Sequence, residues 1–252
     1  EGEKISFKKI FDTLKNFDGT EVLVVGDTII DTYVNTTLLG SNAKTPTFST
    51  KYLGEKKYIG GAAIVAQHLK AAGAKVKFCS VLGKDSLSNL VKNEIKKSGI
   101  KDLTIIDDQR PTTEKKYYIS DGYRLLKVDT VDNSPVNNEI IKRISNHIAK
   151  HKNGIVIFSD FRHGIFSNES IKSLKNSINK GVFKVGDSQV ASRWGNILDF
   201  NNFDLITPNE REARFALADQ DSSIRPLATK LYEHANCKTL IFKLGAKGIL
   251  TL

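Results

Sequence analysis

Short apolar runs and helical patterns alternate along the first part of the chain. Glu21–Val25 (EVLVV) is a β-branched run that ends at a Gly-Asp pair, which predicts a buried first strand. Ala62–Ala72 carries apolar residues at helical spacing and ends at a glycine, and Lys75–Leu82 predicts the next strand. A strand, a helix and a second strand in this order are typical of an α/β protein.

The same alternation continues through the second half of the chain. Further helices are expected at 86–98, at 139–150, near 170–180, from 210 and through 231–235, and further strands at 104–106, 154–159, 183–186, 204–207 and 239–244. Because strands that alternate with helices pair in parallel, this pattern predicts one domain with a central, mainly parallel sheet flanked by helices.

Two segments depart from the alternation. Residues 47–59 alternate between apolar and polar positions, and the strand-like runs 113–120 and 123–129 are joined by Asp121-Gly122, a dipeptide typical of a two-residue hairpin turn. The stretch that follows Asp27 predicts extended or irregular chain rather than a helix. We therefore expect a small, half-exposed antiparallel sheet beside the main one.

Composition limits the class of protein. The chain has 252 residues, of which 40% are hydrophobic, so it can bury a sizeable core. It contains no uninterrupted apolar run of about 18 residues, as a membrane span requires. Residues 1–15 are charged throughout, unlike a secretory signal. Cys79 and Cys237 lie in apolar runs without metal-ligand spacing, which predicts buried thiols. These features favour a cytoplasmic protein that does not interact with membranes.

The formal charge of +10 fits three kinds of partner: a nucleic acid, an anionic surface or a phosphorylated substrate. Lysine and arginine are scattered along the chain, and no nucleic-acid-binding module is visible. The pattern therefore favours a phosphorylated substrate over a nucleic acid, although a solvated lysine-rich surface would look the same.

Polar residues and glycines follow most of the predicted strands. Ligands of an open α/β sheet collect at the carboxyl ends of its strands, so these residues are candidates for a site. They are Asp27, Asp31, Gly60, Gly61, Asp160, Asp187, Asn209, Glu212, Gly245 and Gly248. Taken singly, each has a structural alternative: an aspartate can cap a turn, and a glycine pair can simply begin a helix. The histidines carry little weight, and His147 and His151, at helical spacing without a third ligand, predict surface positions.

Six motifs occur in an order that resembles the ribokinase-type (PfkB) carbohydrate kinases. GDTIID is followed by a sheet excursion, GGAAIVAQHLKAAGAKV and SVLGKD, and then by SDFRHG, TPNEREA and KLGAKG. The resemblance runs from about residue 20 to Leu252. Within the superfamily the chain is most similar to the heptose-phosphate kinase branch, because it also has Arg-Pro-Thr-Thr at 110–113 and a hairpin ending in Leu-x-x-Asp.

The resemblance implies an ATP- and Mg²⁺-dependent kinase that phosphorylates a hydroxyl of a sugar or sugar phosphate. Asp27, Asp31, Gly60 and Gly61 would bind sugar hydroxyls, and residues 32–59 and 110–130 would form a lid that excludes water. Asp160, Asp187, Asn209 and Glu212 would lie near the nucleotide, with Glu212 acting on Mg²⁺ through water. Lys243, Gly245 and Gly248 would border the nucleotide. The basic residues placed to meet a substrate phosphate are Lys44, Arg110, Lys115 and Arg124.

Several features depart from the family pattern. Ile64 replaces an expected Asn, SNAKTPT differs from the branch's Pro-Glu-Ala-Pro stretch, and Lys243 replaces a small hydroxyl residue. These departures leave the sugar open. The family's Gly-Ala-Gly-Asp motif, whose Asp is the catalytic base, is not in the sequence, and we expect it downstream of Leu252.

Two other classes of function remain as alternatives. A catalytically silent binder of sugar or nucleotide would lack the Gly-Ala-Gly-Asp motif altogether. A nicotinamide-dependent oxidoreductase is disfavoured because VLVVGDTIID lacks the Gly-x-Gly-x-x-Gly turn. The family resemblance also allows a homodimer through the lid and a fused nucleotidyltransferase domain.

Overall fold

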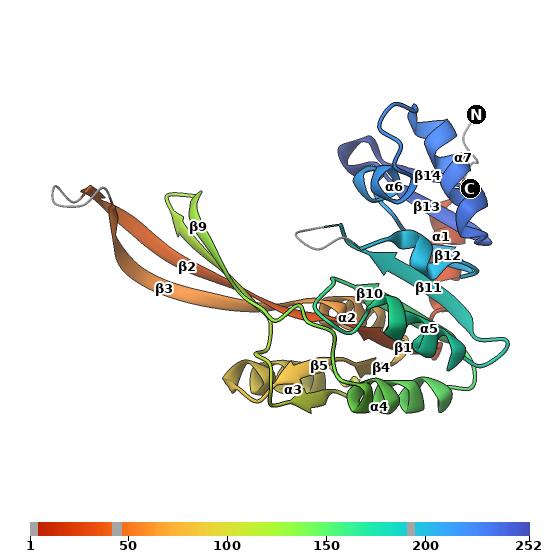
Figure 1. Ribbon diagram of the computed structural model, residues 1–252, viewed down its shortest axis with the longest axis horizontal. Helices are drawn as coiled ribbons and strands as arrows, with labels where there is room; N and C mark the ends of the chain where they lie inside the picture. The colour runs from red at the N-terminus through yellow and green to blue at the C-terminus, as the bar shows by residue number, and fades with distance from the viewer. Residues whose placement is uncertain (1–4, 42–46, 191–194) are drawn as a thin grey trace.

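A computed structural model describes residues 5–41, 47–190 and 195–252. Its main sheet has eight strands in the order β14-β13-β12-β11-β10-β1-β4-β6 (Figure 1). Neighbouring strands are parallel except at the β13–β14 edge, which confirms the predicted α/β fold. The strands are β1 (Glu21–Gly26), β4 (Lys75–Cys79), β6 (Lys101–Asp102), β10 (Ile155–Asp160), β11 (Phe183–Ser188), β12 (Leu205–Ile206), β13 (Thr239–Lys243) and β14 (Ile249–Thr251).

Helices cover both faces of this sheet, and β1 divides the core between them. Leu23 and Val25 pack into one hydrophobic cluster, with α4, α5, α6 and α7, whereas Val22 and Val24 pack into a second cluster with α2 and α3. Because alternate side chains of a strand point to opposite faces, a fully apolar strand is what a sheet covered on both sides requires. The helices are α2 (Ala62–Ala71), α3 (Ser86–Lys97), α4 (Asn138–Ala149), α5 (Asn168–Asn176), α6 (Glu210–Leu217) and α7 (Ile224–Ala235).

A second sheet projects from the body and is called the lid sheet below (Figure 1). Its four strands have the order β3-β2-β8-β9 and are β2 (Thr28–Ser41), β3 (Phe48–Gly61), β8 (Glu114–Ser120) and β9 (Tyr123–Thr130). β2 pairs antiparallel with β3 and parallel with β8. The sequence pattern left 28–41 as extended or irregular chain, whereas the structure makes it one long strand.

Local turns explain how these strands are joined. Asp121 and Gly122 both have positive φ angles (50° and 83°), so the predicted two-residue hairpin between β8 and β9 is confirmed. The single strand predicted at 75–82 is divided at Ser80, whose buried hydroxyl lies 2.8 Å from that of Thr28. After this break β5 (Val81–Gly83) pairs with β7 (Ile105–Asp107) as a separate ladder.

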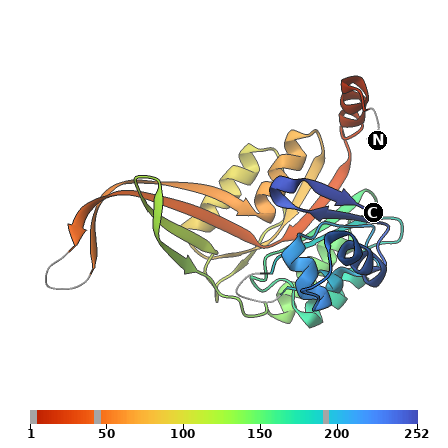
Figure 2. The same cartoon turned by 90° about the horizontal axis from the view of Figure 1, so that it is seen from above.

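Helix α1 (Phe7–Lys15) was not predicted and stands clear of the main sheet in Figure 2. The hydroxyl of Ser6 caps its first turn, and none of its residues is buried. Cys79 and Cys237 are free, buried thiols, as predicted, and burial raises the pKa of Cys79 to about 12. No helix in the described ranges is both long and apolar enough to cross a membrane.

Candidate functional site

Asp31 and Gly60 face each other at the base of the lid sheet. Asp31 lies on β2 directly between Tyr58 of β3 and Lys115 of β8, and Lys115 pairs with Asp129 of β9. A Cβ atom at position 60 would lie 2.8 Å from Oδ2 of Asp31. Glycine at this position therefore leaves room for the carboxylate, which is one reason for the Gly60-Gly61 pair.

Above Asp31 the lid sheet carries a face of aromatic side chains. A cavity of about 530 Å³ is lined by Asp31, Tyr33, Asn35, Lys56, Tyr58 and Ile119. Tyr33 stacks on Tyr117 with ring centroids 5.2 Å apart, and its centroid is 5.8 Å from that of Tyr58 in an edge-on contact. Polyols present both C–H faces and hydroxyl groups, so tyrosines beside a carboxylate suit a sugar.

Cations surround this aromatic face. The guanidinium carbon of Arg124 lies 4.8 Å from the ring centroid of Tyr117, and Lys127 forms an ion pair of 2.7 Å with Asp129. Burial and, second, the charge of Lys127 lower the pKa of Lys115. The structure thus brings Asp31, Lys115 and Arg124 to one face, and their predicted contacts with a substrate stay predictions.

Arg110, one of the basic residues proposed for a phosphate, is not on this face. Arg110 is buried in an ion pair of 2.9 Å with Asp107 and donates to the carbonyl oxygens of Ser134 and His163. It therefore holds loops together, and this geometry does not favour its contact with a phosphate, which stays a prediction. Lys44 lies outside the described residues.

Asp27 and Asp160 form a buried acidic pair at the ends of β1 and β10. Oδ2 of Asp27 accepts hydrogen bonds from the backbone N–H groups of Phe161 (2.9 Å) and His163 (3.2 Å). Oδ2 of Asp160 lies 2.8 Å from Nε of Arg162 and accepts a bond from the hydroxyl of Ser188. Burial raises the pKa of both carboxyl groups, that of Asp160 to about 7.

These contacts bury both aspartates beneath the candidate site, where they stabilise the turn that follows β10. Asp27 is only 3% exposed and Asp160 only 1%, and their oxygens are used by the turn that follows β10. The contact of Asp27 with a sugar and that of Asp160 with a nucleotide stay predictions, and this geometry does not favour a direct contact by either.

His163 is a site residue that the sequence reasoning missed. Its Nδ1 lies 3.3 Å from the hydroxyl of Thr113, at the root of the lid sheet. Burial and, second, the charge of Lys115 lower the pKa of His163 to about 4, so the ring is neutral at physiological pH. Its position in the sequence, directly after the acidic end of β10, was the signal that could have identified it.

The surface position predicted for His151 is wrong, because it is 1% exposed and its Nε2 lies 3.1 Å from the carbonyl oxygen of Ile155.

A second group of predicted residues meets at the carboxyl ends of β11, β12 and β13. Nζ of Lys243 lies 2.9 Å from Oδ1 of Asp187, which also accepts a bond of 2.8 Å from the hydroxyl of Thr207. Lys243 departs from the family pattern, and the ion pair with Asp187 gives it a physical explanation. Beyond it, Gly245 and Gly248 have positive φ angles, and open space surrounds the positions where their Cβ atoms would be.

Asn209 and Glu212 form a capping box at the start of α6. The Asn209 side chain accepts from the Glu212 backbone N–H (2.9 Å), and the Glu212 carboxylate accepts from the Asn209 backbone N–H (2.8 Å) and side-chain amide (2.7 Å). Glu212 is 5% exposed, and burial raises its pKa. The Asn-x-x-Glu motif therefore has a structural role whatever else it does.

The fit of a Mg²⁺ ion can be judged from these donors. Among the described residues no cluster of His, Cys, Asp and Glu side chains could hold a metal ion directly. Both oxygens of Glu212 already accept a hydrogen bond, which agrees with the prediction that it acts on a cation through water. Mg²⁺ bound by nucleotide phosphates keeps several waters, and the acidic side chains here fit that arrangement.

Comparison with known proteins identifies the family. A model of the pfkB family of carbohydrate kinases matches residues 19–252. The chain belongs to this family. Kinases of this family use ATP with Mg²⁺, which agrees with the cofactors expected from the sequence.

Two curated relatives of this carbohydrate kinase are named bifunctional protein HldE. The protein from Helicobacter pylori strain J99 is 32% identical over 247 residues, covering 92% of this chain and 51% of the relative. That from Aliarcobacter butzleri is 26% identical over 235 residues, covering 90% of this chain and 48% of the relative. The chain therefore spans about half the length of the curated relatives it matches.

Solved structures support the same fold. Phosphofructokinase-2 from Escherichia coli in complex with fructose-6-phosphate superposes with a TM-score of 0.74 at 14% identity, covering 92% of this carbohydrate kinase and 77% of that chain. Ribokinase from Giardia lamblia gives a TM-score of 0.69 at 16% identity, covering 92% and 76%. The ribokinase-like fold expected from the sequence is confirmed.

Proposed function

We propose that this carbohydrate kinase transfers a phosphoryl group from ATP to a hydroxyl of a sugar phosphate, of which a heptose phosphate is the leading candidate. One observation carries the proposal: the lid-sheet face places an acidic residue at its base and cations above it. Asp31 accepts hydrogen bonds from hydroxyls, whereas Lys56 and Arg124 attract an anion.

The spacing along β2 suits a phosphorylated sugar. A strand rises about 3.4 Å per residue, so Asp31 and Asn35 are separated by roughly 14 Å along the face. Tyr33 and Lys56 pair across the strands between these two positions. A sugar that presents its accepting hydroxyl to Asp31 can therefore place a phosphate at the cationic end. The HldE names of the curated relatives agree with this substrate class, although the sugar itself is part of the proposal.

Residues at the two ends of the site have different roles in binding and positioning the substrates. Asp31 orients the sugar, and the tyrosines of the lid sheet shield it from water, which would otherwise accept the phosphoryl group. Asn209 and Glu212 orient water at the nucleotide end. Mg²⁺ supplies charge stabilisation for the phosphoryl group when it is bound. The general base stays assigned to the aspartate expected downstream of Leu252.

The alternative of a silent binder also has an observation behind it. Glu212 and Asn209 satisfy each other as a helix cap, so their presence does not require catalysis. A cytoplasmic location and a fused nucleotidyltransferase domain also stay predictions.

ADP release separates the two functions. The full-length protein, with the aspartate expected downstream of Leu252, is screened with Mg²⁺ and ATP against a panel of sugars and sugar phosphates, and release that depends on one sugar phosphate is expected. Asp31→Asn should abolish most of it, whereas Asp12→Asn, an exposed aspartate on α1, should not. On α6, Glu212→Gln should lower kcat, while Glu210→Gln, which removes only an ion pair with Arg214, serves as the matched control. Saturable sugar-phosphate binding without any ADP release would establish the silent binder.

A further inference from the structure

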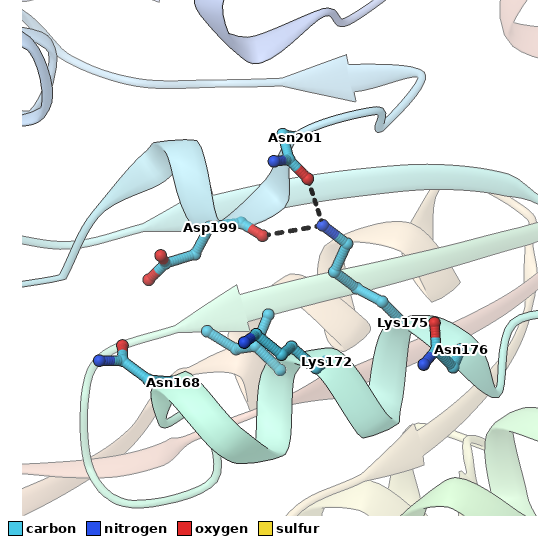
Figure 3. Close-up of a pocket in the computed structure, with 7 residues that line it drawn as sticks. Asn168, Lys172, Lys175, Asn176, Asp199 and Asn201 are labelled. Atoms are coloured by element: carbon cyan, nitrogen blue, oxygen red, sulfur yellow. Dashed lines mark hydrogen bonds between the residues drawn. The ribbon is translucent and has the colours of Figure 1, made fainter.

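A second cavity lies between α5 and the short 3₁₀ helix η1 (Ile197–Phe200), as Figure 3 shows, and α5 lies away from the lid sheet in Figure 1. Its volume is about 650 Å³, and it shares no lining residue with the cavity beside Asp31. Asn168, Lys172, Lys175 and Asn176 line it from one polar stripe of α5. Asn168, Lys172 and Asn176 are exposed and Lys175 is half-buried, so the cavity is open to solvent, and its volume suits a small metabolite.

Lys175 is held in place inside this cavity. Its Nζ donates to the carbonyl oxygen of Asp199 (3.1 Å) and to Oδ1 of Asn201 (2.5 Å), as the dashed lines in Figure 3 show. It also lies 5.7 Å from the ring centroid of Phe203, and burial lowers its pKa. An ammonium group has three N–H donors, so one remains for a ligand.

The remaining charges of the cavity favour an anion. Lys172 is exposed and has neither a hydrogen bond nor an ion pair within the part of the chain that the structure describes. The carboxylate of Asp199 forms an ion pair of 2.6 Å with Nη2 of Arg162, which draws this carboxylate away from the lysines. Two lysines and one carboxylate therefore line the cavity, which leaves an excess of positive charge, and the amides of Asn168 and Asn176 add groups that can bond to hydroxyls.

We propose that this cavity is a second binding site, for a small metabolite that carries a phosphate and hydroxyl groups, and that Asp199 and Arg162 connect it to the sugar site. The lysines would bind the phosphate, and the asparagines would bind the hydroxyls. The connection to the sugar site rests on the function proposed above, whereas the binding itself does not.

The connection is a continuous series of contacts. Arg162, held at a positive φ of 59°, bridges Asp199 (2.6 Å) and Asp160 (2.8 Å). It lies in the turn whose backbone N–H groups hold Asp27, and the Asp27 carbonyl oxygen accepts from the N–H of Ala62 (2.9 Å), next to Gly60-Gly61. A ligand that changes the position of Asp199 therefore acts on the turn that supports the sugar site.

Isothermal titration with glycerol 3-phosphate tests the site in the whole protein. Saturable binding is expected, with Lys172→Gln and Lys175→Gln each weakening it by about tenfold, the effect of one charged hydrogen bond. Lys180→Gln, an exposed lysine beyond the end of α5, and Arg124→Ala, in the lid sheet, should leave the affinity unchanged. Absence of saturable binding would overturn the proposal. So would equal weakening by Lys180→Gln, which means general charge attraction, or weakening by Arg124→Ala alone, which means binding at the sugar site.

Hydrogen exchange tests the connection without using kinase activity. Bound glycerol 3-phosphate should slow exchange at the amides of Phe161 and His163, and Asp199→Asn should remove that protection while binding persists. If the probe binds and these amides exchange at an unchanged rate, the connection through Arg162 is refuted. A kinase assay that fails would leave both measurements interpretable.

Discussion

Gly60→Ala should separate the binding of the sugar from the stability of the fold. The added Cβ would lie 2.8 Å from Oδ2 of Asp31 and 3.5 Å from the carbonyl oxygen of Ile29, so the carboxylate has to turn away. Turning a side chain away from its rotamer costs about 0.5–1.5 kcal/mol. Replacing glycine stiffens the unfolded chain and returns about 0.4–1 kcal/mol. We therefore expect the free energy of unfolding to change by less than about 1 kcal/mol.

The catalytic effect of the same substitution should be much larger. A displaced Asp31 loses charged hydrogen bonds to the sugar, each of which contributes about 1.5–3 kcal/mol. With about 1.4 kcal/mol for each factor of ten, kcat/KM for the sugar phosphate found in the ADP-release screen should fall roughly tenfold to a hundredfold. Thermal unfolding and steady-state kinetics measure the two effects on one preparation.

The neighbouring glycine provides the matched control. Gly61 has φ of +61°, and a Cβ there would lie 2.4 Å from the backbone carbonyl oxygen of Asp27, which cannot turn away. Gly61→Ala should cost at least about 2 kcal/mol and lower Tm by roughly 5 °C or more. The reasoning is refuted if Gly60→Ala lowers Tm as much as Gly61→Ala, or if it leaves kcat/KM at the wild-type value.

Three further predictions concern the lid sheet and its root. His163 has a folded-state pKa of about 4, below its usual 6.5, so the unfolded chain binds more protons than the folded chain between these pH values. The free energy of unfolding should therefore fall as pH drops from about 6.5 to about 4. Thermal unfolding of His163→Gln should show a smaller fall over the same range. Arg124→Ala should raise KM for a sugar phosphate by about tenfold, and leave KM for the unphosphorylated sugar nearly unchanged, as kinetics with both sugars will show. Exposed apolar residues of the lid sheet such as Leu53 support the predicted homodimer through the lid. In sedimentation equilibrium this dimer should dissociate in Leu53→Lys but not in Ile249→Lys on β14. A monomeric wild-type protein would contradict the predicted dimer.

The central sheet was predictable because its pattern is local. Residues 22–25 are apolar without interruption because both faces of β1 are buried, and each following helix is marked by its own spacing and end signals. Strand β2 lacks such a clear signal, since its conformation depends on pairing with β3 on one side and, on the other, with β8, which lies far away in the sequence. Helix α1 did have a signal that went unused: Phe7, Ile10, Phe11 and Leu14 follow a helical spacing after the capping Ser6.

The candidate site was predictable in its parts but not in its contacts. The motif order pointed to Asp31 and Gly60, yet only the register of β2 against β3 shows that the glycine makes room for the carboxylate. Lys243 departed from the family pattern, and its partner Asp187 became evident only once two separate strands were placed side by side. Burial is equally invisible in a sequence, which is why Asp27 seemed as accessible as Asp31.

The pairing of β2 with β8 has a mechanical consequence. The two strands are hydrogen-bonded in register from Ile30–Glu114 to Thr36–Ser120, so the two hairpins of the lid sheet form one continuous unit. The chain joins this unit to the body at four places, next to Thr28, Gly61, Glu114 and Thr130, and the backbone N–H of Ile30 donates to the carbonyl oxygen of Thr113 between two of them. A movement of the lid sheet that admits the sugar should therefore also release the product, and a substitution at one of these junctions should slow or speed both together.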